Sequence, residues 1–121
     1  MSPEFKSVFA SLRAILQKHA GRLSVKDDTP TCYCLAGGMH PKHKTPLPIA
    51  WVNVGKAYVS YHLMPVYGCP HLIDACSKKL KARMQGKSCF NFKVSDEALF
   101  AELEQLTVDG FAAFKSAGYM P

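Results

Sequence analysis

Hydrophobic residues recur every three or four positions over the first part of the chain, which is the spacing of a helix with one buried face. Ser2 can cap the first turn, Pro3 suits the first helical position, and Gly21 can end the helix. We therefore predict a first helix that packs on a core through Phe5, Val8, Phe9, Leu12, Ile15, Leu16 and His19.

Alternation of apolar and polar residues predicts strands in the middle of the chain. Residues 22–26 favour a short strand, whose pattern is the least regular, and residues 31–36 favour a second one. Residues 37–48 are rich in proline and glycine and contain Lys42 and Lys44, so we predict an exposed and mobile loop there.

The clearest local pattern is a hairpin, in which two alternating segments flank Gly55 and Lys56. A Gly-X pair is typical of a two-residue type II′ turn, and such a turn would pair Val54 with Ala57. Alternation then defines two faces. One is a core face of Ala50, Val52, Val54, Ala57, Val59 and Tyr61, and the other consists of Ile49, Trp51, Asn53, Tyr58, Ser60 and His62.

Helical periodicity returns twice in the second half of the chain. It predicts a helix over residues 72–85 that ends at Gly86, and a final helix that is capped by Ser95 and kinked near Gly110. Residues 88–93 lie between these helices and alternate as a strand does.

The order of predicted elements is helix, three or four strands, helix, strand, helix, where the count depends on whether residues 22–26 form a strand. This order predicts a single α+β domain over residues 1–121, with an antiparallel-rich sheet of about four to five strands and helices packed on one face. The composition agrees with a globular domain, since 48% of the residues are hydrophobic and 20% are charged.

Charge and cysteine content limit the classes of partner and the cellular compartment that the sequence favours. The net charge of +6 makes acidic partners plausible, but we find no helix-turn-helix, zinc-finger or RNA-binding strand motif and do not expect nucleic acid. No apolar run approaches the roughly 20 residues of a membrane span, and the N-terminus lacks a signal-peptide pattern. Five cysteines, an odd number, fit free thiols, so we predict a cytoplasmic protein without membrane association.

Six positive charges lie within residues 78–93. On the predicted helix, Lys79 and Arg83 fall at the edge of the apolar stripe, and Lys87 follows it. The three side chains could hold a phosphate or carboxylate, Arg83 best because its planar fork allows bidentate contacts. The alternative is an ordinary solvated helix face.

The second face of the predicted hairpin is a candidate binding surface. Trp51 and Tyr58 offer flat apolar area with a polar tip, and Asn53, Ser60 and His62 offer directional hydrogen bonds. This mixture suits a small organic ligand or a protein partner. The alternative is a second layer of packing beneath the long loop that precedes the hairpin.

Four residues form a candidate metal or thiol site: Cys32, Cys34, Cys69 and His71. Thiolate and imidazole are good ligands for zinc or copper, but this spacing fits no standard zinc pattern. Cysteine is also a small residue that is readily buried, so ordinary packing is the alternative.

Two segments carry a family resemblance: "YVSYHLMPVYGCP" (58–70) and "LKARMQGKSCFNFKVSDEALFAEL" (80–103). Their pattern of an aromatic-rich strand, a helix, Gly86-Lys87, a strand and a leucine-rich final helix resembles the YdhG-like family of small bacterial domains. The resemblance covers most of the chain. It implies a compact α+β domain in a bacterial protein and leaves the activity open.

A frataxin-like iron role is attached to part of that family, and it requires an acidic ridge on the first helix and first strand. Here the first helix offers only Glu4 among Lys6, Arg13 and Lys18. We therefore assign no iron-site residue and expect no cofactor.

The sequence as a whole favours a non-catalytic module in the bacterial cytoplasm that binds a small ligand or a protein partner through the hairpin face. Lys79, Arg83 and Lys87 would supply charge for an anionic ligand if the two surfaces adjoin. A metal- or thiol-handling protein, with a frataxin-like iron role or a Cys/His site, is one alternative. A small enzyme of unspecified reaction is another, since constellations of catalytic residues form only on folding.

Overall fold

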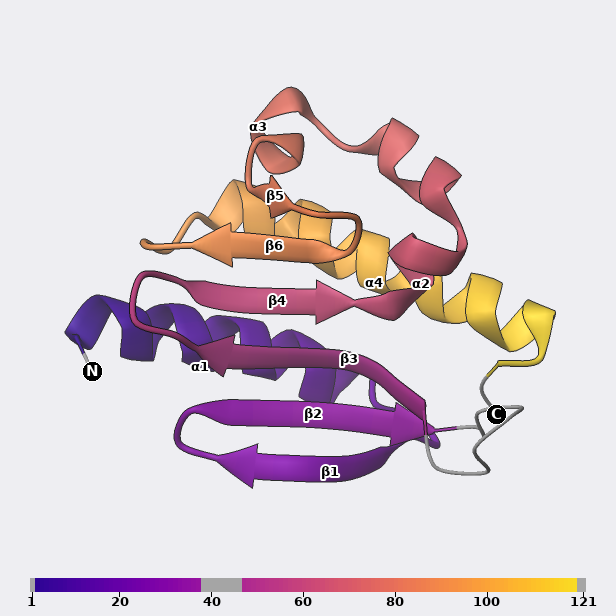
Figure 1. The fold of residues 1–121 in the computed structure, drawn as a ribbon, viewed down its shortest axis with the longest axis horizontal. Coiled ribbons are helices and arrows are strands. Elements are labelled where there is room, and N and C mark those ends of the chain that lie inside the picture. The colour runs from indigo at the N-terminus through magenta and orange to yellow at the C-terminus, as the bar shows by residue number, and fades with distance from the viewer. Residues whose placement is uncertain (1, 38–46, 120–121) are drawn as a thin grey trace.

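The computed structural model describes residues 2–37 and 47–119, so most of the predicted loop, including Lys42 and Lys44, lies outside the described residues. The described chain is a single α+β domain with a six-stranded antiparallel sheet in the order β1-β2-β3-β4-β6-β5 (Figure 1). This confirms the predicted fold class, with slightly more strands than expected. The elements are α1 (Pro3–Lys18), β1 (Ser24–Thr29), β2 (Cys32–Gly37), β3 (Leu47–Val54), β4 (Val59–Leu63), α2 (Met64–Gly68), the 3-10 helix η1 (Pro70–Ala75), α3 (Lys78–Lys81), β5 (Met84–Gln85), β6 (Cys89–Phe92) and α4 (Glu97–Ala117).

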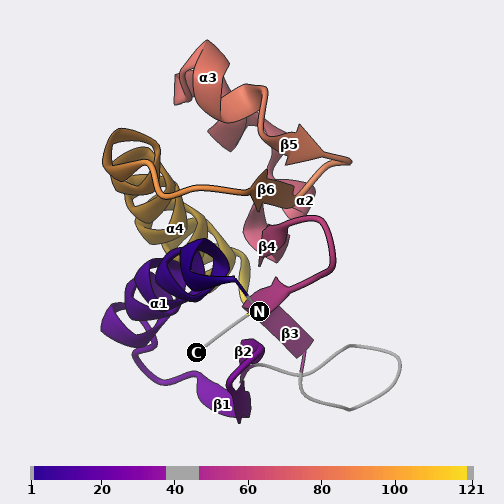
Figure 2. The same cartoon turned by 90° about the vertical axis from the view of Figure 1, so that its left-hand side faces the viewer.

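The two long helices, α1 and α4, cover the same face of the sheet (Figure 2). The core lies between them and the strands, and one polar contact crosses it: the Tyr61 hydroxyl lies 2.6 Å from Thr107 Oγ1. Both residues are fully buried. The largest fully buried apolar side chains include Leu12, Leu16, Leu35, Ile49, Leu63, Leu80, Phe90, Phe92 and Leu103.

Helix α1 begins as predicted. The Phe5 backbone N–H donates to Ser2 Oγ at 3.1 Å, and Pro3 occupies the first turn. The helix ends at Lys18, and Gly21 follows with a φ of 55°, a left-handed conformation that suits glycine. Apart from Phe5 and His19, which are only partly buried, the predicted apolar face is buried.

The prediction of a single helix over residues 72–85 is wrong. Pro70 opens the 3-10 helix η1, the chain bends, and α3 forms one turn before β5 begins at Met84. Ser77 starts α3 anew because its Oγ accepts from the Leu80 N–H at 3.2 Å. Glu102 on α4 fixes this bend by accepting from both the N–H and the hydroxyl of Ser77, each at 2.8 Å.

The hairpin forms between β3 and β4, but its turn is longer than predicted. Val54 pairs with Val59, so the loop contains four residues and is closed by the Gly55 N–H, which donates to the Tyr58 carbonyl at 2.8 Å. The register therefore differs by two residues from the predicted one, and Trp51 lies opposite His62. Because strand side chains alternate with a period of two, the two faces keep most of their predicted residues.

The final helix differs from the prediction at both marked positions. Asp96, not Ser95, caps α4, since Asp96 Oδ1 accepts from the Leu99 N–H at 3.1 Å. The helix continues through Gly110, where the missing side chain permits close packing instead of a kink: an added Cβ would lie 2.9 Å from Pro65 Cβ. Gly110 thus allows α2 to dock on α4.

Candidate functional site

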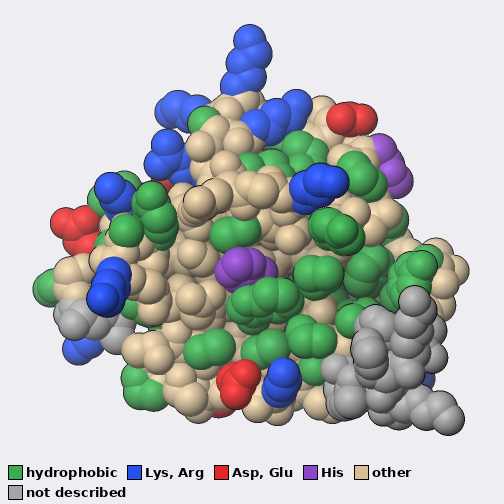
Figure 3. Space-filling model, in the orientation of Figure 1, with side chains coloured by type: hydrophobic (Ala, Val, Ile, Leu, Met, Phe, Trp, Pro, Cys, Tyr) green, Lys and Arg blue, Asp and Glu red, His purple; other side chains and the backbone are tan. Residues whose placement is uncertain are grey.

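No helix of the described chain covers the sheet face opposite α1 and α4 (Figure 2). Residues that pair across neighbouring strands share a face, so the register defines what this open face carries. Figure 3 views it directly and shows a histidine near the centre, bordered by hydrophobic side chains. Two cross-strand rows make up its middle: Cys34, Trp51, His62, Cys89 and Gln85 in one, and Cys32, Asn53, Ser60 and Asn91 in the other.

Trp51 and His62 stack at the centre of the open face. Their ring centroids lie 4.7 Å apart with an interplanar angle of 14°. Burial lowers the pKa of His62 below its ordinary value, so the imidazole is neutral near pH 7. The stack follows from the observed register, because the shorter predicted turn would have placed Ser60 opposite Trp51.

A hydrogen-bonded network extends from the stack towards the edge of the sheet. Ser60 Oγ donates to Asn91 Oδ1 at 2.7 Å, and Asn91 Nδ2 donates to Gln85 Oε1 at 2.6 Å. The Cys89 thiol donates to the same Asn91 oxygen at 3.3 Å and lies 3.8 Å from His62 Nε2. The network fixes the orientation of both amide groups.

A hollow of about 290 Å³ adjoins this network, next to the β3–β4 turn. We call it the polar hollow; it is lined by Tyr58, Ala82, Arg83, Met84, Gln85, Asn91 and Lys93. The Lys93 ammonium lies 5.6 Å from the centroid of the Tyr58 ring. Over the residues that the structure describes, neither Arg83 nor Lys93 forms a salt bridge with a carboxylate. The hollow therefore presents two cations that are available to an anion.

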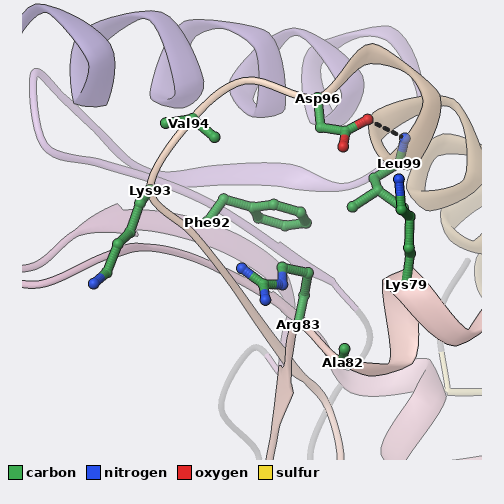
Figure 4. A pocket seen from close by; sticks show the side chains of 8 residues that line it. All are labelled: Lys79, Ala82, Arg83, Phe92, Lys93, Val94, Asp96 and Leu99. Atoms are coloured by element: carbon green, nitrogen blue, oxygen red, sulfur yellow. Dashed lines mark hydrogen bonds between the residues drawn. The ribbon is translucent and has the colours of Figure 1, made fainter.

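A second hollow of about 230 Å³ shares Ala82, Arg83 and Lys93 with the polar hollow (Figure 4). We call it the apolar hollow; it is lined by Lys79, Ala82, Arg83, Phe92, Lys93, Val94, Asp96 and Leu99. Figure 4 shows Lys79 and Arg83 extending towards the floor formed by Phe92 and Leu99.

The three cations predicted to share one anion site are divided by the structure. Arg83 lines both hollows and Lys79 lines the apolar one. Lys87 lies elsewhere, 5.9 Å from the centroid of the Tyr67 ring, in a different cavity that Ile73 also lines. The structure does not bring Lys87 to the other two cations, because β5 turns the chain at the point where the prediction placed Lys87 just beyond a helix.

Three residues of the site were missed by sequence reasoning: Gln85, Asn91 and Lys93. Asn91 and Lys93 alternate with the buried Phe90 and Phe92, and this alternation could have placed them on the open face. Gln85 gave no such signal, since its segment was taken for a helix.

The candidate metal ligands are not assembled into one site. Cys32 and Cys34 lie on the open face of β2, where burial raises the pKa of both thiols. Cys69 and His71 lie at the junction of α2 and η1. Within residues 2–37 and 47–119, no group of three or more histidine, cysteine, aspartate or glutamate side chains is placed to hold a metal ion.

Comparisons with models of protein families, with curated proteins and with solved structures gave no match. Considering only the described parts of the chain, none of the helices is long and apolar enough to cross a membrane.

Proposed function

We propose that this protein is a non-catalytic binding module for a small organic anion, which it takes up in the polar hollow at the corner of the open sheet face. The observation that carries the proposal is the pairing of two cations, Arg83 and Lys93, with an aromatic ring and fixed amide groups in one hollow. The proposal keeps the predicted role of Tyr58 and Arg83, and the resemblance to the YdhG-like family stays a prediction beside it.

Each group in the hollow has a separate role in recognition. The Arg83 guanidinium can hold a carboxylate or phosphate through two parallel hydrogen bonds, and Lys93 adds a point charge. The ring of Tyr58 offers a flat surface for an aromatic group. The hydrogen bonds of Asn91 and Gln85 hold their amides in place before a ligand arrives, which lowers the entropy cost of binding.

The size and charge of the site limit the ligand. A volume of about 290 Å³ lies at the lower end of ligand pockets, which begin at roughly 300 Å³. A single substituted ring with one anionic group is the scale that fits. The net charge of +6 adds a general attraction for anions, which salt screens.

The Trp51–His62 stack extends the same surface. It reaches the hollow through Cys89 and Asn91, so a ligand longer than one ring would lie across the stack and meet Asn53 and Ser60 next to it. The neutral imidazole of His62 makes this central part of the face suitable for uncharged aromatic area.

Binding of benzoate and of phenyl phosphate, followed by amide chemical shifts, tests the proposal. We expect shifts centred on Tyr58, Gln85 and Asn91. Arg83→Gln should weaken binding about 10- to 100-fold, since a hydrogen bond to a charged group contributes about 1.5–3 kcal/mol. Lys93→Gln should act in the same direction with a smaller effect.

Arg22→Gln is the matched control. Arg22 is exposed and lies before β1, at the far end of the sheet order, and its replacement changes the net charge by the same amount. If Arg83→Gln and Arg22→Gln bind benzoate with equal affinity, the net positive charge of the protein attracts the anion non-specifically and the proposed site is wrong.

A further inference from the structure

The polar and apolar hollows lie side by side, because Ala82, Arg83 and Lys93 line both. We propose that they form one bipartite site for an amphipathic anion, with its carboxylate or phosphate between Arg83 and Lys93 and its short hydrocarbon part in the apolar hollow. This inference rests on the proposed function and names the class of ligand more closely.

The lining of the apolar hollow supports a hydrocarbon occupant. Phe92 and Leu99 belong to the buried core and form its floor, whereas Val94 is 56% exposed at its border. A ligand chain placed there would remove an exposed valine from water and extend the core outwards. Each hollow alone is at or below the lower limit of roughly 300 Å³ for ligand pockets, and the two together exceed it.

The charges of the apolar hollow fix the direction in which such a ligand lies. Asp96 lines this hollow and accepts from the Leu99 N–H at 3.1 Å, so its carboxylate would repel an anion placed deep inside. Figure 4 shows the Lys79 ammonium on the side of Asp96 and Leu99, apart from the Arg83 guanidinium. The lining of the polar hollow contains Arg83 and Lys93 and no carboxylate, so the anionic end is favoured there and the hydrocarbon end in the apolar hollow.

A series of straight-chain carboxylates tests the orientation, with acetate, butyrate and hexanoate as the probes and calorimetry as the measurement. Each methylene buried on binding should raise the affinity about fourfold. Acetate should shift only resonances around the polar hollow, whereas hexanoate should also shift those of Val94, Phe92 and Leu99.

Val94→Ser should reduce the increase in affinity from butyrate to hexanoate and leave the affinity for acetate unchanged. Val94 lines the apolar hollow and not the polar one. Val25→Ser is the matched control, since Val25 on β1 is similarly exposed at 50% and lies at the opposite edge of the sheet. Arg83→Gln should weaken all three carboxylates. Thermal unfolding of each variant checks that the fold is retained.

Two outcomes would overturn the inference. If hexanoate bound no tighter than acetate, the site would have no part that binds hydrocarbon. If the affinity difference between butyrate and hexanoate were the same in Val94→Ser as in the wild type, the hydrocarbon chain would bind somewhere other than the apolar hollow. Neither outcome affects the proposed function, which is tested separately by whether Arg83→Gln binds benzoate more weakly than Arg22→Gln does.

Discussion

His62 is a single residue whose surroundings make a prediction about pH. Burial lowers its pKa from the ordinary value of 6.5, and the stacked Trp51 ring and the Cys89 thiol, whose own pKa is raised by burial, are its neighbours. The unfolded chain therefore binds a proton at His62 more readily than the folded chain does. The titration of His62 therefore leaves the free energy of unfolding unchanged above about pH 6.5 and lowers it as the pH drops below that value.

Urea unfolding at several values between about pH 5 and 7.5 measures this contribution. His62→Phe keeps an aromatic partner for Trp51 but cannot be protonated, so we expect its stability to depend less on pH over this range. His71→Phe is the matched control, because it makes the same replacement at an exposed histidine of the 3-10 helix η1. Equal pH dependence in the His62→Phe variant and the wild type would contradict the prediction.

Gly110 shows how one residue fixes the contact between two elements. Alanine in place of glycine inside a helix is normally stabilising by about 1 kcal/mol. Here the added methyl would lie 2.9 Å from Pro65 Cβ, and the proline ring of α2 cannot turn away. We therefore expect Gly110→Ala to lower the free energy of unfolding by about 1–3 kcal/mol, as overpacking of a close contact does.

The measurement is a urea titration of Gly110→Ala beside Ser116→Ala, an exposed position of the same helix. Ser116→Ala should change the stability by less than about 0.5 kcal/mol. A stabilised Gly110→Ala variant would show that α2 gives way and does not rely on this contact.

The sequence predicts elements well where one local pattern decides them. The apolar stripe of α1 and the alternation of β6 lead to the right elements because each buries one face against the core. Residues 72–85 mislead because Leu72, Ile73, Leu80 and Met84 keep a helical spacing while they reach the core from separate short elements. The contact of Ser77 with Glu102, 25 residues away, fixes that bend and leaves no mark in the local pattern.

The candidate site is predictable only in part, because contacts between residues that are distant in the sequence assemble it. The alternation of β3 and β4 is enough to place Trp51 and His62 on one face, but the turn length decides that they stack. Arg83 and Lys93 are ten positions apart, and only the pairing of β5 with β6 brings them to one hollow. A site built from neighbouring strands is thus set by register, which the sequence pattern does not specify.

At the scale of the whole molecule, one core joins the elements from both halves of the chain. Buried residues of α1, β2, β3, β4, β6 and α4 belong to a single cluster, and the Tyr61–Thr107 contact lies within it. No described element has a separate core of its own. A domain of this kind normally unfolds in one cooperative transition.

Trp51 makes this prediction easy to test, because it is the only tryptophan and lies on the open face, away from the helices. Its fluorescence reports β3, whereas far-UV circular dichroism is dominated by α1 and α4. We expect both signals to change at the same urea concentration. If the fluorescence changed first, the open face would loosen before the helices leave the sheet, and a preformed binding surface on that face would need a ligand to hold it together.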